Sequence, residues 1–391
     1  MRIGIFTDTY YPQLNGVATS VLMLKEKLQA KGHQVYIFTT TDPEAPRREP
    51  RVYRLPSLPF VGDRRMGMFY HYGLAKMVRR LDLDLIHTNT EFPLGIFGRY
   101  MARELQLPMV HTMHTIYEDY THYITKFRML DSLAKTVAKK VSGDFCNSAD
   151  HVIVPTEKVK DLMRSYGVTK EITAIPSGIE LGRFEPGQYS QSAIQELRQE
   201  LGISQEAKVL LFVGRIAEDK NISELFYSLQ RYLQEHRELC FLLIGDGPYR
   251  SRLEDLAQEL DLADKIIFAG ARPWDEIGKY YQAGDVFVNA SQSEAQGLTY
   301  IEAMASGLPV IAKADRCLEG ILEDGVNGFA FRDEAGLVGA LEQVLADAGT
   351  REKLAQGALK TASRFSADGF AQQVAGVYEQ LLNSKPYRRV S

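Results

Sequence analysis

Two glutamates frame a short glycine-containing turn in the second half of the chain. Glu294 precedes Gly297 by three residues, and Glu302 follows it by five. Carboxylates accept hydrogen bonds from hydroxyl groups, which sugars carry in large numbers. The same spacing also fits a loop charge at Glu294 and a capping or solvated Glu302, because glutamate is mostly a surface residue. Spacing alone leaves both interpretations open.

Backbone N–H groups accompany these glutamates. The short apolar run Asp285–Asn289 predicts a buried strand, and Leu298–Ser306 predicts a helix that ends at Gly307. A helix that opens directly after a strand points its first N–H groups at a ligand, and this geometry predicts an anion site. The groups concerned belong to Gly297, Leu298 and Thr299, and Gly297 also lets a ligand approach the backbone closely.

Two cations lie in the loop after another predicted strand. Arg215 and Lys220 follow Lys208–Val213, and either Asn221 or Ser223 is placed to cap the next helix. A guanidinium fork and an ammonium charge beside a helix N-terminus can hold a diphosphate. The alternative is a pair of solvated surface charges.

The first half of the chain has weaker signals. Gly16 stands just before a predicted helix, where a phosphate can approach the backbone, although a single glycine more often marks a turn. His111 and His114 end a predicted strand, where a histidine is usually structural. Asp82 and Asp84 have metal-ligand spacing but precede their strand, so we expect a strand-entry turn and no metal site.

The run Ile244-Gly-Asp-Gly-Pro248 is similar to part of a dinucleotide-binding fingerprint. Arg250 occupies the place of the third glycine, and no pyrophosphate-type helix follows cleanly. We therefore expect a turn here and not an NAD site.

The predicted strands alternate with helices in both halves of the chain. This alternation predicts an α/β fold with parallel, doubly wound sheets. Two such Rossmann-like domains bind ligands at the carboxyl ends of their strands, across a shared cleft. The expected strands are Arg2–Thr7, Gln34–Thr39, Asp84–Asn89, Pro108–Thr112, His151–Val154, Lys208–Val213, Cys240–Ile244, Lys265–Phe268, Val286–Asn289, Pro309–Ala312 and Gly328–Phe331, and the first helix is expected at Ala18–Lys31.

We expect three parts along the chain. Residues 1–185 form a first domain, residues 186–365 form a second domain, and residues 366–391 form a helix that crosses back to the first domain. The turn-rich stretch Gly182–Ser192 is interpreted as the linker. A length of 391 residues suits two domains.

Composition places the chain among ordinary globular proteins, with 45% hydrophobic and 25% charged residues. No apolar run approaches the roughly 18 residues of a membrane-spanning helix, and the N-terminus begins with a strand instead of a signal peptide. The scattered cysteines Cys146, Cys240 and Cys317 predict reduced, buried thiols of a cytoplasmic protein.

Charge is divided unequally along the chain. Residues 1–185 carry 25 Lys and Arg against 20 Asp and Glu (25 − 20 = +5), and residues 186–391 carry 21 against 30 (21 − 30 = −9). A basic half predicts a polyanionic surface as partner. Residues 58–70 and 122–140 mix cations with apolar side chains, so we expect them to dock on anionic lipid, the alternative being a solvated basic face. With no nucleic-acid-binding motif and an acidic second half, nucleic acid is not expected.

The two-glutamate motif resembles a known signature. Glu294, seven residues, Glu302 and then Ala-Met-Ala-Ser-Gly-Leu-Pro309 resemble the motif of retaining GT-B glycosyltransferases, which use nucleotide-sugar donors. The resemblance implies that Glu294 touches the transferred sugar and Glu302 the ribose. It also implies that Arg215 and Lys220 hold the donor's diphosphate.

Further motifs narrow the resemblance. Phe6–Pro12, Gly16–Ser20, Tyr117–Ile124 and Glu294–Tyr300 are similar to bacterial 1,2-diacylglycerol 3-glucosyltransferases of glycosyltransferase family 4, over Met1 to about Phe365. These enzymes make monoglucosyl-diacylglycerol from UDP-glucose. The resemblance implies UDP-glucose and diacylglycerol as substrates, no metal, and a site at the inner face of the cell membrane. It implies that residues 1–185 are the acceptor and membrane-facing domain and that residues 186–365 bind the nucleotide sugar. It also implies that His114, in preference to His111, reaches the donor sugar.

Retention through a covalent intermediate needs two carboxylates about 5 Å apart. Glu302 and Glu294 are assigned to the ribose and the sugar. We therefore expect the acceptor hydroxyl to attack the face of the sugar from which the phosphate leaves, and the leaving phosphate to take the proton. Alternatives are a hexosyltransferase that extends a glycolipid or glycosylates a soluble sugar, a nucleotide-sugar epimerase on the same fold, and a non-catalytic nucleotide-sugar sensor. Glucose and galactose differ by one epimeric hydroxyl, so the donor hexose stays open.

Overall fold

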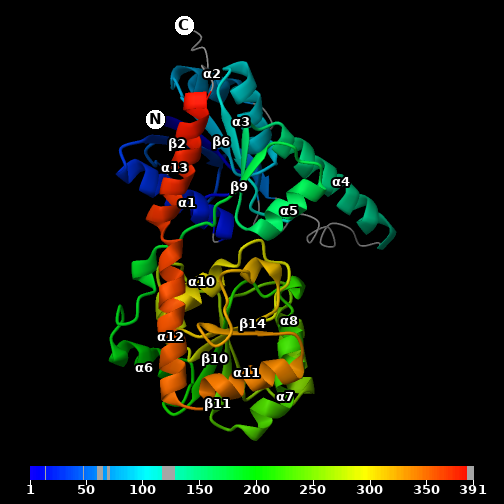
Figure 1. Ribbon diagram of the computed structural model, residues 1–391, viewed down its shortest axis with the longest axis vertical. Coiled ribbons are helices and arrows are strands. Elements are labelled where there is room, and N and C mark those ends of the chain that lie inside the picture. Colours follow the sequence, from blue (N-terminus) through cyan, green and yellow to red (C-terminus); the bar gives the residue numbers. More distant parts are fainter. Residues whose placement is uncertain (14, 47, 60–64, 68–70, 117–127, 385–391) are drawn as a thin grey trace. The chain divides into compact units, whose positions relative to one another are not determined.

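The chain forms two compact units, which are described separately. The computed structural model describes residues 1–384 apart from 14, 47, 60–64, 68–70 and 117–127. Unit 1 comprises Met1–Gly178 together with Ala367–Ser391, and unit 2 comprises Ile179–Ser366. Each unit is built on its own parallel sheet (Figure 1).

Unit 1 has a seven-stranded sheet in the order β3-β2-β1-β6-β7-β8-β9, with every neighbouring pair parallel. Its central strands are buried throughout, as expected for a parallel sheet that is covered on both faces. The strands are β1 (Arg2–Phe6), β2 (Gln34–Thr40), β3 (Val52–Leu55), β6 (Leu85–Thr88), β7 (Met109–Thr112), β8 (His151–Val154) and β9 (Glu171–Ala174). A separate antiparallel pair consists of β4 (Ser57–Pro59) and β5 (Arg65–Gly67).

The helices of unit 1 include one from the far end of the chain. They are α1 (Gly16–Ala30), α2 (Tyr72–Arg80), α3 (Pro93–Glu104), α4 (Arg128–Asn147), α5 (Glu157–Ser165) and α13 (Ala367–Ser384). Helix α13 runs beside α1 (Figure 1), and Phe370 and Val374 join Ile3 and Leu24 in one buried cluster. The last helix is therefore part of the core of unit 1.

Unit 2 has a six-stranded parallel sheet in the order β12-β11-β10-β13-β14-β15. Alternate residues of β10 enter different cores: Val209 and Leu211 pack on one face, Leu210 and Phe212 on the other. The sheet is therefore doubly wound. Its strands are β10 (Lys208–Val213), β11 (Leu239–Ile244), β12 (Ile266–Gly270), β13 (Val286–Asn289), β14 (Val310–Lys313) and β15 (Gly328–Phe331).

Seven α-helices are described in unit 2. They are α6 (Gln191–Glu200), α7 (Ile222–Glu235), α8 (Arg250–Glu259), α9 (Ile277–Gln282), α10 (Leu298–Ala305), α11 (Glu334–Leu345) and α12 (Ala348–Ala362). Short 3-10 helices occur at Leu181–Arg183, Glu218–Lys220, Arg316–Leu318 and Ser363–Phe365.

The interpretation of Gly182–Ser192 as a linker is wrong. The units divide at Gly178/Ile179, before this stretch and before the expected boundary at 185/186. Phe184 is 1% exposed and its ring packs edge-on against Tyr281, with centroids 5.6 Å apart. A buried aromatic side chain anchors the stretch in unit 2, and Gln191 already begins α6.

Candidate functional site

In unit 2, three loops follow neighbouring strands at one edge of the sheet. Strands β11, β10 and β13 are adjacent and parallel, so residues 214–221, 245–249 and 290–297 leave from the same edge. Ligands of doubly wound sheets bind at this edge. All the predicted donor-binding residues except Gly16, His114, Thr299 and Glu302 lie on these loops or at the first residue of the helix that follows.

Lys220 and Glu294 meet directly, although 74 residues separate them in the chain. Lys220 Nζ donates to Glu294 Oε1 at 2.6 Å, and both side chains are largely buried. A short charge-assisted bond of this kind fixes both side chains. The structure therefore brings together the predicted diphosphate cation and the predicted sugar carboxylate.

Asp219 links the second cation to the same cluster. Its Oδ1 lies 2.9 Å from Arg215 Nη2, its Oδ2 lies 3.7 Å from Lys220 Nζ, and its side chain is only 5% exposed. The Ser293 hydroxyl donates to the Asp219 carbonyl at 3.2 Å. Asp219 was not among the residues selected from the sequence, although it directly precedes Lys220 in the loop.

Glu302 is not a solvated helix residue. It is 9% exposed on α10, and Tyr281 of α9 donates its hydroxyl to Glu302 Oε2 at 2.7 Å. Burial raises the pKa of Glu302, while the Tyr281 hydrogen bond and the nearby Arg183 act in the opposite direction. Tyr281 precedes Glu302 by 21 residues on another helix, so no sequence spacing could identify it.

The N-cap residue of α10 makes no side-chain cap bond, because it is a glycine. Gly297 takes the N-cap place with φ 74°, a left-handed conformation that suits glycine. A Cβ on Gly297 would lie 2.4 Å from Cδ2 of Tyr300, whose ring packs against this turn. The backbone N–H groups of Leu298 and Thr299 begin the helix here, as predicted from the sequence.

The glycines of Ile244–Pro248 face protein backbone. A Cβ on Gly245 would lie 1.9 Å from the Gly214 carbonyl oxygen, and one on Gly247 would lie 2.2 Å from that of Ile216. Ile216 N donates to the Asp246 carbonyl at 2.9 Å. These glycines therefore let the loop after β11 pack on the loop after β10, which explains them without an NAD site.

The expectation that Asn221 caps α7 with its side chain is wrong. Asn221 stands at the N-cap place with φ 58°, and its Nδ2 donates to Glu224 Oε2 at 2.8 Å instead of its oxygen accepting from the helix. Ser223 lies inside α7 and so cannot be the N-cap residue.

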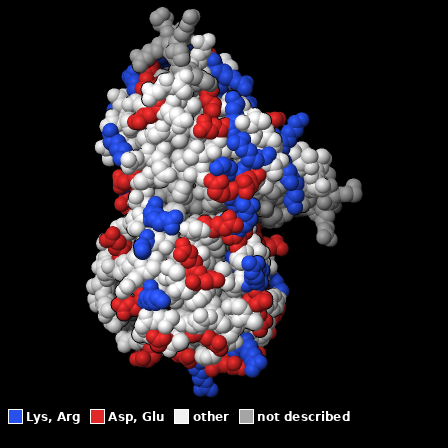
Figure 2. Space-filling view, viewed as in Figure 1, with Lys and Arg blue, Asp and Glu red and all other residues white. Residues whose placement is uncertain are grey.

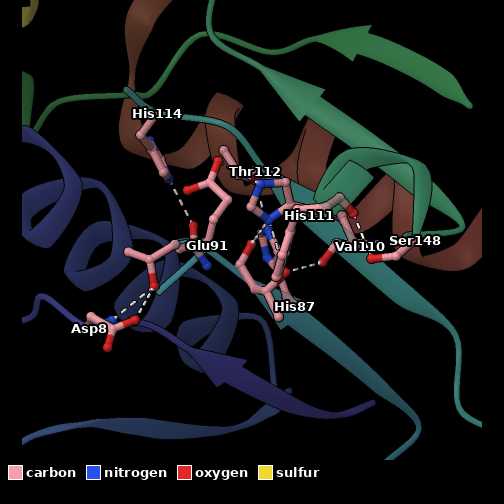
Figure 3. Close-up of polar contacts among 12 residues, drawn as sticks. Asp8, His87, Glu91, Val110, His111, Thr112, His114 and Ser148 are labelled. Carbon is pink, nitrogen blue, oxygen red and sulfur yellow. Dashed lines mark hydrogen bonds and ion pairs between the residues drawn. The ribbon is translucent and has the colours of Figure 1, made fainter. Parts of the chain in front are cut away.

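A second polar cluster lies at the strand ends of unit 1 (Figure 3). Asp8, after β1, is 6% exposed; it accepts the Thr90 hydroxyl at 2.6 Å and the Leu94 N–H at 3.2 Å. Burial raises the pKa of Asp8 from 3.8 to about 6, and these hydrogen bonds offset part of the rise. A carboxylate that is difficult to ionise therefore lies at the N-terminus of α3.

The two candidate histidines have different surroundings. His111 is fully buried; its Nδ1 lies 2.9 Å from Thr88 Oγ1 and its Nε2 lies 3.4 Å from Glu91 Oε1. His114, after β7, is half-buried, and its Nε2 lies 2.8 Å from Asn89 Oδ1. Because His111 is enclosed, the preference for His114 as the substrate-facing residue stays our prediction.

The remaining predicted positions are placed as follows. Gly16 is exposed as the first residue of α1, which the Asn15 side chain caps by accepting from Ala18 N. Asp84 accepts from Arg2 N at 2.7 Å and Asp82 pairs with Arg2, so both lie at strand entries. Across the described ranges, no three His, Cys, Asp or Glu side chains gather as metal ligands would.

Some predictions lie outside the described residues. These are the whole aromatic run Tyr117–Ile124, residues 60–64 and 68–70 of the first expected docking segment, and residues 122–127 of the second. The three cysteines are buried, as expected, and form no disulfide with one another, and burial raises the pKa of the Cys240 thiol to about 11. No helix in the described part of the chain is both long and apolar enough to cross a bilayer.

Sequence comparisons match both units to known families. Residues 14–183 match the model described as glycosyltransferase family 4, and residues 193–361 match that of glycosyl transferases group 1. The chain is 41% identical to an alpha-monoglucosyldiacylglycerol synthase of Streptococcus pneumoniae over 100% of this chain and 88% of the relative. It is 35% identical to the Acholeplasma laidlawii protein of the same name, over 98% of each.

Comparison with solved structures identifies the fold as GT-B. Anabaena Alr3699/HepE in complex with UDP-glucose matches with a TM-score of 0.76 at 21% identity, over 97% of this chain and 100% of that chain. A sucrose-phosphate synthase from Thermosynechococcus elongatus matches with a TM-score of 0.75 at 24% identity, over 98% and 100%.

Proposed function

The chain belongs to glycosyltransferase family 4, among the α-monoglucosyldiacylglycerol synthases, and on this basis we propose that it transfers glucose from UDP-glucose to diacylglycerol. The product is an α-monoglucosyl-diacylglycerol, formed with retention at the sugar's anomeric carbon. Full-length identity of 41% to an enzyme with this name carries the assignment of reaction and acceptor.

Unit 2 supports a donor site at the edge formed by β10 and β13. Arg215 and Lys220 supply two positive charges for a diphosphate, and the N-terminus of α10 adds backbone N–H groups. In this structure the charge of Lys220 is shared with Glu294 and Asp219. We infer that the diphosphate takes part of this charge, which leaves Glu294 available to a sugar hydroxyl.

Glu302 is suited to a ribose hydroxyl. One of its oxygens already accepts from Tyr281, and a buried carboxylate that accepts a second hydroxyl gains a further hydrogen bond. Its role is therefore to bind the nucleoside and not to attack the sugar. Glu294 pairs with Lys220, so neither glutamate is placed as a covalent nucleophile.

Without a protein nucleophile, the acceptor hydroxyl attacks the face from which the phosphate leaves, and the leaving phosphate oxygen takes its proton. The protein contributes positioning and stabilises the charge that develops on the leaving group. Arg215 and Lys220 perform this stabilisation, and we propose that no metal ion takes part. We propose that His114 contacts the donor sugar and that a phosphate approaches the backbone at Gly16.

A diacylglycerol remains in the bilayer, so we propose that the enzyme docks peripherally on the inner face of the cell membrane. Helix α4 carries an exposed apolar row, with Leu133 62%, Val137 53% and Val141 50% exposed. Spacing of four residues places them on one helix face, and Lys140, seven residues after Leu133, lies on the same face. Figure 2 shows further Lys and Arg on the side of unit 1 that carries α3 and α4.

Apolar and cationic side chains on one face fit an anionic bilayer, because the apolar groups enter the headgroup region while the cations meet lipid charge. This surface is called the α4 face below and consists of Leu133, Val137, Lys140 and Val141. It would hold the enzyme at the depth where the acceptor hydroxyl lies.

A donor-by-acceptor panel with UDP release as readout tests the function. We expect release only with UDP-glucose and diacylglycerol, undiminished by EDTA, and an α-anomeric product by NMR. Preference for a glucosylated lipid or a soluble sugar would make the chain a different hexosyltransferase. Donor conversion without acceptor would indicate an epimerase, and donor binding without release would indicate a sensor.

A further inference from the structure

Asn89 lies beside His114 at the carboxyl edge of the unit 1 sheet. It follows β6 directly, is 3% exposed, and its Oδ1 lies 2.8 Å from His114 Nε2. Its Nδ2 is buried and has no hydrogen-bond partner among the described residues. A buried amide N–H without a partner is unfavourable, so its persistence needs an explanation.

The contact fixes the tautomer of His114. An amide oxygen only accepts hydrogen bonds, so the hydrogen in this contact is on His114 Nε2. Burial and the neighbouring His111 of β7 lower the pKa of His114 to about 3. The other titratable groups of this cluster are His87 of β6 and Glu91, which contacts His111. The ring is therefore neutral near pH 7, and its Nδ1 has a lone pair that accepts hydrogen bonds but cannot donate one.

We propose that Asn89 is a positioning residue for His114 and also binds the substrate. Its Oδ1 holds His114 in the Nε2–H form, and its unpartnered Nδ2–H donates to an oxygen of the bound sugar. Together the two side chains offer one acceptor and one donor, the pattern that recognises a hydroxylated ligand. The proposal rests on the proposed function in taking His114 as a donor-sugar contact.

Two substitutions test the roles of Asn89 Oδ1 and Nδ2 separately. Asn89→Asp keeps an acceptor for Nε2–H, removes the N–H donor and raises the pKa of His114 by adding a negative charge. Asn89→Ala removes both contacts. Asn147→Asp, at the end of α4, makes the same chemical change as a matched control, since Asn147 bonds only to the 167–169 turn in the contacts described.

We expect kcat/KM for UDP-glucose to fall about 10- to 100-fold in both Asn89 variants, as loss of one buried hydrogen bond to a ligand implies. In Asn89→Asp the loss should deepen as the pH falls, because protonated His114 has no lone pair on Nδ1. In wild type and Asn147→Asp, kcat/KM should not fall in this way between pH 8 and pH 5. Histidine ¹⁵N NMR of the full chain should show the Nε2–H form of His114 in wild type and a raised pKa in Asn89→Asp.

An unchanged kcat/KM and pH profile in Asn89→Asp would overturn the proposal. A His114 signal that shows the Nδ1–H form in wild type would also overturn it. So would a His114 signal that does not change between wild type and Asn89→Ala. A wild-type protein that transfers no glucose would instead contradict the proposed function. In that case the NMR result alone decides whether Asn89 positions His114, and calorimetry with UDP and UDP-glucose decides whether it binds the sugar.

Discussion

Arg215 and Lys220 serve the same diphosphate in our proposal, but Asp219 and Glu294 hold them differently. Arg215→Ala or Lys220→Ala should each lose about 2–4 kcal/mol of transition-state stabilisation, the usual value for one preorganised charge contact. The measurement is kcat/KM for UDP-glucose. Arg252→Ala, which breaks a surface ion pair with Glu259 on α8, is the control and should have little effect.

Substitutions of Glu294 and Glu302 should affect different steps, sugar transfer for Glu294 and nucleoside binding for Glu302. Glu294→Ala removes the sugar contact, so turnover should collapse while UDP still binds. Glu302→Ala should weaken UDP itself, because the carboxylate is assigned to the ribose. Calorimetric titration with UDP measures both, and UDP affinity lost in Glu294→Ala but kept in Glu302→Ala would reverse the assignment.

Tyr281→Phe gives a control for Glu302. It removes the 2.7 Å hydrogen bond to Glu302 but keeps the carboxylate in place. UDP affinity that falls equally in Tyr281→Phe and Glu302→Ala would indicate that disturbed packing, and not the lost ribose contact, weakens binding.

Asp8 makes stability depend on pH in a defined direction. Its pKa is raised from 3.8 to about 6, so the folded state binds a proton more tightly than the unfolded state. The stability of the folded state should therefore fall as the pH rises from about 4 through 6 and then level off, by about 3 kcal/mol at most. Asp8→Asn should remove this dependence and be more stable than wild type at pH 7.5 but not at pH 4.

Urea unfolding at the two pH values measures the effect of Asp8. Asp368→Asn, an exposed carboxylate at the start of α13, is the control and should show no comparable change between the two pH values. An equal effect of Asp8→Asn at pH 4 and 7.5 would mean that Asp8 ionises normally in the folded protein.

At the level of single residues, the sequence predicted the side chains that belong to a recognisable motif. It did not predict the side chains that only contact those motif residues. Arg215, Lys220, Glu294 and Glu302 all lie at or beside one strand edge of unit 2. Tyr281 and Asn89 could not be found, because each meets its partner through tertiary packing across 21 and 25 residues. Asp219 could have been found, since a buried acid beside two cations is an expected partner.

Among elements, four strand boundaries were predicted to the residue. His151–Val154, Lys208–Val213, Val286–Asn289 and Gly328–Phe331 are confirmed with the same limits. Strands β3 and β9 were missed; they form the two edges of the unit 1 sheet, and their sequences Val-Tyr-Arg-Leu and Glu-Ile-Thr-Ala have weak apolar patterns. Edge strands are covered less and so show less hydrophobic signal.

The turn before α10 tests how much an element depends on one glycine. Gly297→Ala would place a Cβ 2.4 Å from the Tyr300 ring in a left-handed conformation. We expect a loss of about 2 kcal/mol or more in unfolding free energy, from backbone strain together with displacement of the ring. UDP affinity should also fall, because the helix N-terminus moves.

Gly339→Ala is the matched change for Gly297→Ala. Gly339 lies inside α11, and a Cβ there meets no atom within 4 Å. It should stabilise the protein by about 0.5–1 kcal/mol, as alanine does in a helix interior. Thermal unfolding of the two variants measures the difference, and similar melting temperatures would contradict the strain argument.

For the whole molecule, docking through the α4 face should need both its apolar and its charged side chains. Leu133→Ser/Val137→Ser removes apolar contact, and Lys140→Glu reverses the charge on the same face. All three side chains are exposed, so folding should be unaffected. Each cation near an anionic surface contributes about 1 kcal/mol, and a charge reversal roughly doubles the change.

Cosedimentation with vesicles of increasing anionic lipid fraction measures this binding. Wild type should bind more as the anionic fraction rises and less as salt screens the charges. The lysine variant should lose most of this response, whereas the serine variant should weaken binding at every lipid composition. Lys353→Glu/Lys360→Glu changes two exposed cations on α12 of unit 2 and should bind like wild type. Equal binding of all four proteins to neutral and anionic vesicles would show that the α4 face does not dock on the membrane.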